Sequence, residues 1–151
     1  KLAVFGVDNE KLANFAFADA TYRVTDIPEG LFVDHAFECV GGAASQSAID
    51  QIIDHIQPEG TIGLLGVSEY PVPINTRMVL EKGLRLYGSS RSGRSDFVKT
   101  VELYQSHPEI VNYLDAIVGA RIEVRSMADM VRAFEMDIHK SMGKTIMHWM
   151  Q

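Results

Sequence analysis

The chain has 151 residues, a formal net charge of -6 and a single cysteine, Cys39. With 46% hydrophobic and 23% charged residues it has the composition of a globular protein, which excludes intrinsic disorder. Its apolar runs are too short for a transmembrane helix of about 20 residues, and its acidic balance disfavours nucleic acid, whose phosphates need clustered Lys and Arg. One cysteine cannot form an internal disulfide, which predicts a reducing, cytoplasmic location.

The first half of the chain has short apolar runs that alternate with helical patterns. Strands are expected over residues 2–7, 21–24, 34–40 and 61–65. A short helix is expected over 10–17. A longer helix is predicted to start at Ser45, because serine is a good N-cap and isoleucines follow it at helical spacing. The turn at 58–60 should end this longer helix.

The middle of the chain carries two prolines within residues 70–74. Because proline cannot donate to a strand ladder, this segment is predicted to be an edge or irregular strand. A helix over 75–81, stopped by Gly83, precedes a strand over 84–87.

The last third continues the alternation, after a segment at 89–95 that is rich in Gly, Ser and Arg and is a candidate hinge. Ser95 is predicted to cap a helix over 97–105, and Pro108 to start another. The remaining elements are strands over 121–124 and 145–149, and a helix over 127–138 that opens with a Ser126–Asp129 capping box. This alternation predicts βαβ units, a parallel sheet and an α/β fold.

Four predicted strand ends are small, apolar and rich in glycine: residues 5–8, 39–42, 65–68 and 88–90. In a doubly wound sheet, ligands bind at the carboxyl ends of the strands, and glycine lets a flat ligand approach the backbone. The segments are therefore either tight βα turns or a nucleotide platform. The phosphate-binding pattern G-x-G-x-x-G is absent. Either the ligand is not a dinucleotide, or the chain begins just after that loop.

Gly6 and Asp8 bear on the choice of cofactor. An acid about 20 residues past the glycine loop binds the ribose of NAD and repels a 2′-phosphate. Asp8 is either that acid or the N-cap of the following helix. Alternatively Gly6 holds the position of the acid, and its lack of a side chain leaves room for a 2′-phosphate.

The sequence offers little other catalytic chemistry. Cys39 shares a strand face with His35, but a zinc site needs at least three ligands, and none joins this pair. We therefore expect Cys39 to be a small buried hydrophobe rather than a metal ligand or a reactive thiol. No Ser/His/Asp signature is visible. Catalytic groups are thus absent or lie outside these residues.

Several segments resemble zinc-dependent medium-chain alcohol dehydrogenases. They are KLAVFGVDNEKLANFAFADA, DHAFECVGG, GTIGLLGVSE, GLRLYGSSRSGRSDF and AFEMDIHKSMGKTIM, and they extend over nearly the whole chain. More narrowly, FADATYRVTDIPEG, VDHAFECVGG and LLGVSEYPVPINTRMVLEKGLRLYGSSRSGR resemble ribulose-5-phosphate reductases (ribitol-5-phosphate 2-dehydrogenases). That family supplies ribitol phosphate for CDP-ribitol and for teichoic acid or capsule.

The resemblance implies the C-terminal part of a longer enzyme. Residues 1–91 would form a Rossmann-type doubly wound parallel sheet that lacks its first strand, and 92–151 would pack on a catalytic domain. Zinc ligands and the glycine loop would lie upstream of Lys1, so the segment should be inactive alone. The absent strand belongs in the middle of the sheet, which would leave two inner edges unpaired unless residues 2–7 or a neighbouring chain fill the gap.

The resemblance also implies NADPH as the cofactor, with NAD as the alternative. Gly6 suits NADPH, although no Arg adjoins it in the sequence to pair with the phosphate. The family's cofactor contacts fall on Gly6, Lys11, Cys39, Val40, Gly41, Leu65, Gly66, Val67, Ser89, Ser90 and Lys144. Lys144 would reach the pyrophosphate, its alternative being a solvated lysine. We hypothesise separately that Arg91 or Arg94 binds the phosphate of the substrate.

The implied reaction is hydride transfer from NADPH to the C2 carbonyl of D-ribulose 5-phosphate, giving D-ribitol 5-phosphate. The expected partners are this sugar phosphate, a second copy of the chain joined through 70–74 and 84–87, and a cytidylyltransferase. One alternative is another zinc-dependent polyol or alcohol dehydrogenase. Further alternatives are an AdoMet-dependent methyltransferase, with Asp8 as the ribose acid, and a non-catalytic nucleotide-binding domain.

Overall fold

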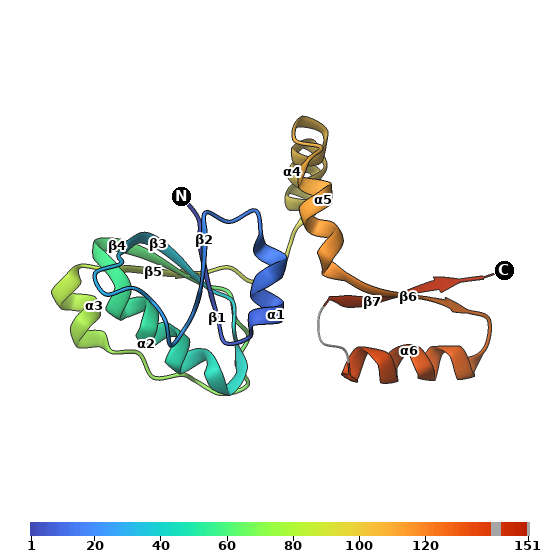
Figure 1. Ribbon diagram of the computed structural model, residues 1–151, viewed down its shortest axis with the longest axis horizontal. Helices are drawn as coiled ribbons and strands as arrows, with labels where there is room; N and C mark the ends of the chain where they lie inside the picture. The colour runs from blue at the N-terminus through green and yellow to red at the C-terminus, as the bar shows by residue number, and fades with distance from the viewer. Residues whose placement is uncertain (140–142, 151) are drawn as a thin grey trace. The chain divides into compact units, whose positions relative to one another are not determined.

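The structure, a computed structural model, describes residues 1–139 and 143–150 (Figure 1). The chain divides into two compact units. One comprises Ile27–Ser92, and the other comprises Lys1–Asp26 together with Gly93–Gln151.

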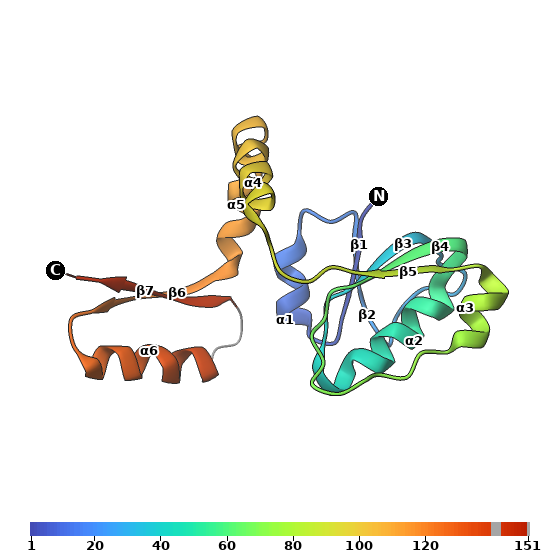
Figure 2. The same cartoon turned by 180° about the vertical axis from the view of Figure 1, so that it is seen from behind.

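The unit Ile27–Ser92 is built on a three-stranded parallel sheet in the order β3-β4-β5. Its elements are β3 (Val33–Glu38), η2 (Gly42–Ala44), α2 (Ser45–His55), β4 (Ile56–Leu64), α3 (Thr76–Lys82) and β5 (Arg85–Gly88). Figure 2 shows α2 and α3 beside these strands. The isoleucine stripe of α2 packs into one core cluster, which comprises Ile49, Ile53, Ile56, Ile62 and Leu84. The helical spacing of the isoleucines therefore does bury one face of α2, as predicted.

Helix α2 begins and ends differently from the prediction. Its N-cap is Ala44, and Ser45 is the first helical residue with only 3% of its surface exposed, so the expected serine cap is wrong. The preceding turn η2 brings the chain into helical geometry before Ser45 is reached. The helix stops at His55, three residues before the predicted turn. There Lys82 of α3 donates from Nζ to the carbonyl oxygens of Ile53 (2.5 Å) and Ile56 (3.0 Å).

Residues 70–74 form an irregular segment outside the described strands, so the predicted strand is wrong there. Its prolines remove two of the donors that a ladder would need. The next helix does follow the prediction. Asn75 caps α3 by accepting from the Met78 backbone N–H at 3.2 Å, and Gly83 ends it with a φ of 62°.

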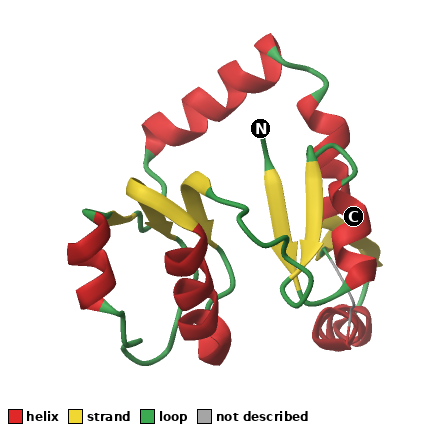
Figure 3. Ribbon diagram, turned by 60° about the vertical axis from the view of Figure 1, so that its left-hand side comes forward, coloured by secondary structure: helices red, strands yellow, loops and turns green. Residues whose placement is uncertain are grey.

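The second unit contains two separate two-stranded parallel sheets. Its first part holds β1 (Ala3–Gly6), α1 (Asn9–Leu12), the turn η1 (Ala13–Phe15) and β2 (Ala20–Arg23). The single helix expected over 10–17 is thus divided between α1 and η1. Figure 3 shows β1 and β2 side by side and pointing the same way, and Ala3 pairs with Ala20 at the start of the register.

The rest of this unit holds α4 (Arg94–Ser106), α5 (Ile110–Leu114), η3 (Asp115–Ile117), β6 (Val118–Val124), α6 (Met127–His139) and β7 (Lys144–Trp149). Strands β6 and β7 pair in parallel. The Ser95 cap is wrong: Gly93 is the N-cap of α4, and its backbone N–H donates to Asp96 at 2.7 Å. The capping box at α6 is confirmed, since Ser126 and Asp129 exchange backbone-to-side-chain hydrogen bonds of 3.1 and 3.3 Å.

The sheets are parallel and the class is mixed α/β, as predicted. Among the described residues, the edge of β1 opposite β2 and the edge of β3 opposite β4 have no strand partner. Each of the three described sheets thus ends in two edges without a strand partner, and residues 2–7 pair with β2 and not with β3.

Candidate functional site

Three of the four glycine-rich strand ends meet at one edge of a sheet. Glu38, Leu64 and Gly88 are register neighbours at the carboxyl ends of β3, β4 and β5. Because the strands are parallel, the segments that follow them leave the sheet side by side. This edge therefore brings together Cys39, Val40, Gly41, Leu65, Gly66, Val67, Ser89 and Ser90.

A buried carboxylate organises two of these segments. Glu38, 2% exposed, accepts through Oε1 from the backbone N–H groups of Val40 (2.9 Å) and Gly41 (2.8 Å). Its Oε2 accepts from the backbone N–H of Gly66 at 3.0 Å. A charged oxygen that accepts backbone N–H groups forms a strong hydrogen bond, and such bonds gain strength where water is excluded. Glu38 thus ties the segment after β3 to the segment after β4.

Sequence reasoning missed Glu38, which was treated only as part of a strand. The sequence did contain a signal, since Glu38 ends an apolar strand shortly before two glycines. A carboxylate buried at such a place needs hydrogen-bond donors, because burying it without them is costly. Two of the three donors to Glu38 are local, but the third, the backbone N–H of Gly66, is 28 residues away, and the pattern of one strand does not identify it.

The glycines here serve contact between the two segments. Gly41 has a φ of +68°, and a Cβ on it would lie 2.6 Å from the carbonyl oxygen of Val67. A Cβ on Gly66 would overlap the Glu38 carboxylate and the Gly41 backbone nitrogen. Gly42 adds a backbone hydrogen bond to the Val67 carbonyl at 2.8 Å. These glycines therefore allow the segments after β3 and β4 to contact each other. This close packing explains the glycines without requiring that a ligand approaches the backbone.

Apolar side chains remain exposed next to this rigid backbone. Val40 is 60% exposed and Val67 87% exposed, and Ser89 and Ser90 are exposed as well. Exposed valines offer apolar surface to a ring, and exposed hydroxyls can bind a polar ligand group.

Cys39 lies at the same edge and is exposed, so the expectation of a buried hydrophobe is wrong. The strand ends at Glu38, so Cys39 lies in the segment after the strand and not on a buried strand face. Partial enclosure of the thiol and the negative charge of Glu38 both raise the pKa of Cys39 above its usual 9.0. The thiol therefore stays protonated at neutral pH, which disfavours a reactive nucleophile.

The end of β1 carries Gly6, Asp8 and Lys11. Asp8 caps α1, since its Oδ1 accepts from the backbone N–H groups of Glu10 (2.8 Å) and Lys11 (3.2 Å). The N-cap interpretation of Asp8 is confirmed. A Cβ on Gly6 would lie 3.0 Å from the Leu12 side chain, which is buried, and Lys11 is exposed on α1.

An arginine does lie beside Gly6, although none adjoins it in the sequence. Arg23 is the register neighbour of Gly6 across the β1–β2 pair, and its Nη2 donates to the carbonyl oxygen of Val7 at 3.4 Å. Finding this residue from the sequence would require the parallel register, which places residues 17 positions apart next to each other.

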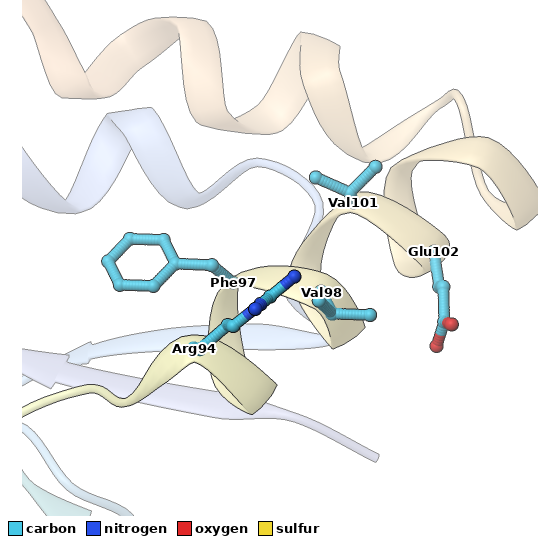
Figure 4. Close-up of a pocket in the computed structure, with 5 residues that line it drawn as sticks. All are labelled: Arg94, Phe97, Val98, Val101 and Glu102. Atoms are coloured by element: carbon cyan, nitrogen blue, oxygen red, sulfur yellow. The ribbon is translucent and has the colours of Figure 1, made fainter.

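The remaining predicted residues are dispersed. Lys144 is exposed and starts β7 opposite Val118. Arg91 is exposed with a φ of 67°. Arg94 starts α4 and lines a shallow depression of about 300 Å³ together with Phe97, Val98, Val101 and Glu102, all on that helix (Figure 4).

No group of three or more His, Cys, Asp or Glu side chains in the described part of the chain could hold a metal ion. None of the helices in residues 1–139 and 143–150 is long and apolar enough to cross a membrane.

Sequence comparison identifies close relatives. A ribulose-5-phosphate reductase of Bacillus spizizenii is 56% identical over 149 residues, which cover 99% of this chain and 44% of the relative. A ribulose-5-phosphate reductase of Streptococcus pneumoniae is 44% identical, again over 99% of this chain and 42% of the relative. The chain thus spans less than half the length of the curated relatives that it matches.

Solved structures give the same result. The crystal structure of S. aureus TarJ in complex with NADPH matches 100% of this chain and 48% of that chain, with a TM-score of 0.97 and 54% identity. L-idonate 5-dehydrogenase from Escherichia coli matches with a TM-score of 0.77 at 16% identity, which shows a shared fold alone. The family model described as zinc-binding dehydrogenase matches residues 5–106, and the chain therefore belongs to the zinc-binding dehydrogenase family.

Proposed function

We propose that this chain is the cofactor-binding, C-terminal portion of an NADPH-dependent reductase that converts D-ribulose 5-phosphate to D-ribitol 5-phosphate. The observation that carries the proposal is 56% identity, over nearly the whole chain, to a ribulose-5-phosphate reductase. The NADPH-bound crystal structure that this chain matches supports the choice of cofactor.

The proposed architecture is a Rossmann-type doubly wound sheet without its first strand. In the strand order of that fold, the first strand lies between the second and the fourth. In this proposal the strand would pair with the edge of β1 opposite β2 and with the edge of β3 opposite β4, two of the edges that have no partner among the described residues. Residues 1–91 then form the cofactor domain, and 92–151 form the segment that packs on the catalytic domain. The full-length protein that carries this chain would supply the strand and its glycine loop.

The edge of the β3-β4-β5 sheet fits a dinucleotide. Glu38 holds the loop backbone in place, and exposed Val40 and Val67 lie beside it, so a planar ring can stack there without reorganising the loops. When bound, NADPH supplies the hydride for the carbonyl carbon. In this proposal Cys39, Leu65 and the other residues gathered at this edge bind and orient the nicotinamide and its ribose, and Lys144 reaches the pyrophosphate.

Zinc does not fit this chain. The described residues hold no suitable ligand cluster, so we propose that the zinc ligands of the full-length protein lie in its other part. Polarisation of the substrate carbonyl would then be a function of that part and not of the residues described above.

The proposal extends to the substrate and to partners. Arg91 or Arg94 would bind the phosphate of the sugar, because a guanidinium binds phosphate through two parallel N–H groups. A second copy of the chain would pair through 70–74 and 84–87. A cytidylyltransferase would use the product, and all three would meet in the cytoplasm.

The test is turnover by the full-length protein. With NADPH and D-ribulose 5-phosphate, we expect NADPH absorbance to fall and ribitol 5-phosphate to accumulate. D-ribulose without the phosphate is the matched control and should react far more slowly. Turnover of an unphosphorylated polyol or ketose instead would identify another dehydrogenase, and calorimetric binding of AdoMet in place of NADPH would contradict the proposal altogether.

A further inference from the structure

We infer that Arg23 recognises the 2′-phosphate of NADPH at the carboxyl end of β1 and so sets the preference for NADPH over NADH. The inference rests on the proposed function, because it names a residue for part of the proposed cofactor. It concerns the opposite half of the dinucleotide from the nicotinamide contacts proposed above.

The sheet register brings Arg23 to this place. Strands β1 and β2 pair in parallel, with Gly6 opposite Arg23, and the Val24 backbone N–H donates to the Gly6 carbonyl at 3.0 Å (Figure 3). The Arg23 side chain then reaches across to the Val7 carbonyl at 3.4 Å. Its guanidinium therefore lies at the loop that leaves β1, where a cofactor's adenosine ribose binds in folds of this kind.

The Arg23 guanidinium has more N–H donors than its contact with Val7 uses. A guanidinium carries five N–H donors, and the contact with Val7 is long for a hydrogen bond. In the part of the chain that the structure describes, Arg23 is exposed and forms no ion pair with a carboxylate. Two parallel N–H groups can therefore turn toward a phosphate without breaking an existing ion pair.

The acids of the same loop do not oppose this role. Gly6 has no carboxylate, so nothing at that position competes for the ribose hydroxyls or repels a phosphate. Asp8, two residues after Gly6, already accepts two backbone N–H groups of α1 through Oδ1. Lys11 is exposed on α1 and adds positive charge close to Gly6 along the chain. Because every variant below keeps Lys11, a change in affinity reports on the substituted arginine.

The experiment compares cofactor affinities in the full-length protein. Dissociation constants for NADPH and NADH are measured by nicotinamide fluorescence, and those for adenosine 2′,5′-bisphosphate and adenosine 5′-monophosphate by calorimetry. Arg23→Ala should weaken binding of the two 2′-phosphorylated ligands about 10- to 100-fold, the usual effect of losing a charge-assisted pair. NADH and the monophosphate should change by less than about 2-fold, because they lack the group that the arginine binds.

A conservative variant and a control variant complete the experiment. Arg23→Lys should retain an intermediate preference for NADPH, because lysine keeps the charge but not the forked geometry, and it preserves the side chain stem if the alanine variant is unstable. Arg77→Ala is the matched control, since Arg77 is an exposed arginine on α3, outside the cofactor and pairing segments proposed above. It should leave all four constants unchanged.

Several outcomes overturn the inference. If wild type binds NADPH tightly and Arg23→Ala binds it equally well, Arg23 is not the determinant, although the proposed function stands. Equal weakening of NADPH and NADH would mean that Arg23 serves only the structure of the loop. If the wild-type protein binds neither nicotinamide cofactor, the proposed function falls and this inference falls with it.

Discussion

Removal of the Glu38 carboxylate tests the central structural claim about the candidate site. In Glu38→Ala, the backbone N–H groups of Val40, Gly41 and Gly66 lose their acceptor. The N–H of Gly41 is buried, and leaving such a donor unsatisfied costs about 1–3 kcal/mol. The other two bonds are partly buried, and water can replace part of each, so each contributes about 0.5–1.5 kcal/mol.

The sum predicts that Glu38→Ala loses about 2–6 kcal/mol of unfolding free energy, an upper range because the three bonds share one group. Glu38→Gln should lose less. Its carbonyl oxygen can still accept from Val40 and Gly41, but its NH₂ group then faces the N–H of Gly66, and two donors cannot bond to each other. The glutamine variant should therefore disconnect the segment after β4 while keeping the segment after β3.

The assay is chemical denaturation of the full-length protein, combined with amide hydrogen exchange at Gly41 and Gly66. Glu81→Ala is the matched control. Glu81 lies on α3 in an exposed ion pair with Arg77 at 2.7 Å, and loss of such a pair costs about 0.3–0.5 kcal/mol. If Glu38→Ala costs no more than Glu81→Ala, and exchange at the two glycines stays unchanged, the carboxylate does not hold these loops together.

Two other predictions follow from the same structure. Gly66→Ala should destabilise the protein and weaken NADPH binding, because its Cβ would overlap the Glu38 carboxylate. Gly88→Ala meets only an ordinary 3.5 Å contact and should leave stability nearly unchanged; thermal unfolding compares the stabilities, cofactor titration follows Gly66→Ala, and equal destabilisation would contradict the close approach at Gly66. The Ser126 hydroxyl, with a backbone N–H, holds the pKa of Asp129 below its usual 3.8, so the stability from this cap is fully present above about pH 4 and is lost as pH falls through the lowered pKa. Asp129→Asn should therefore be less stable at neutral pH and lose less stability on acidification, as followed by denaturant titrations at several pH values; an unchanged acid response would exclude Asp129 as its source.

Family membership and the glycine-rich character of the strand ends could be predicted from the sequence, because both depend on local patterns. That three of these ends meet at one edge depends on the order of the strands. Residue patterns within a few positions also located most elements, for example α3 between Asn75 and Gly83. The caps of α2 and α4 were wrong for a physical reason. A serine caps a helix only if its own backbone is still extended. In both helices the N-cap lies before the serine, at Ala44 and at Gly93, so Ser45 and Ser95 are already helical.

The amino-acid sequence by itself determined the alternation of strands and helices, the glycine-rich strand ends and the Ser126–Asp129 capping box. Each of these features depends on residues that lie within a few positions of one another along the chain. Tertiary structure alone decided that Glu38 would bond to Gly66 and that Arg23 would lie beside Gly6. Those neighbours are distant in sequence, and they meet because strand pairing and register bring them together. Side chains that act between strands are therefore visible only once the sheets have formed.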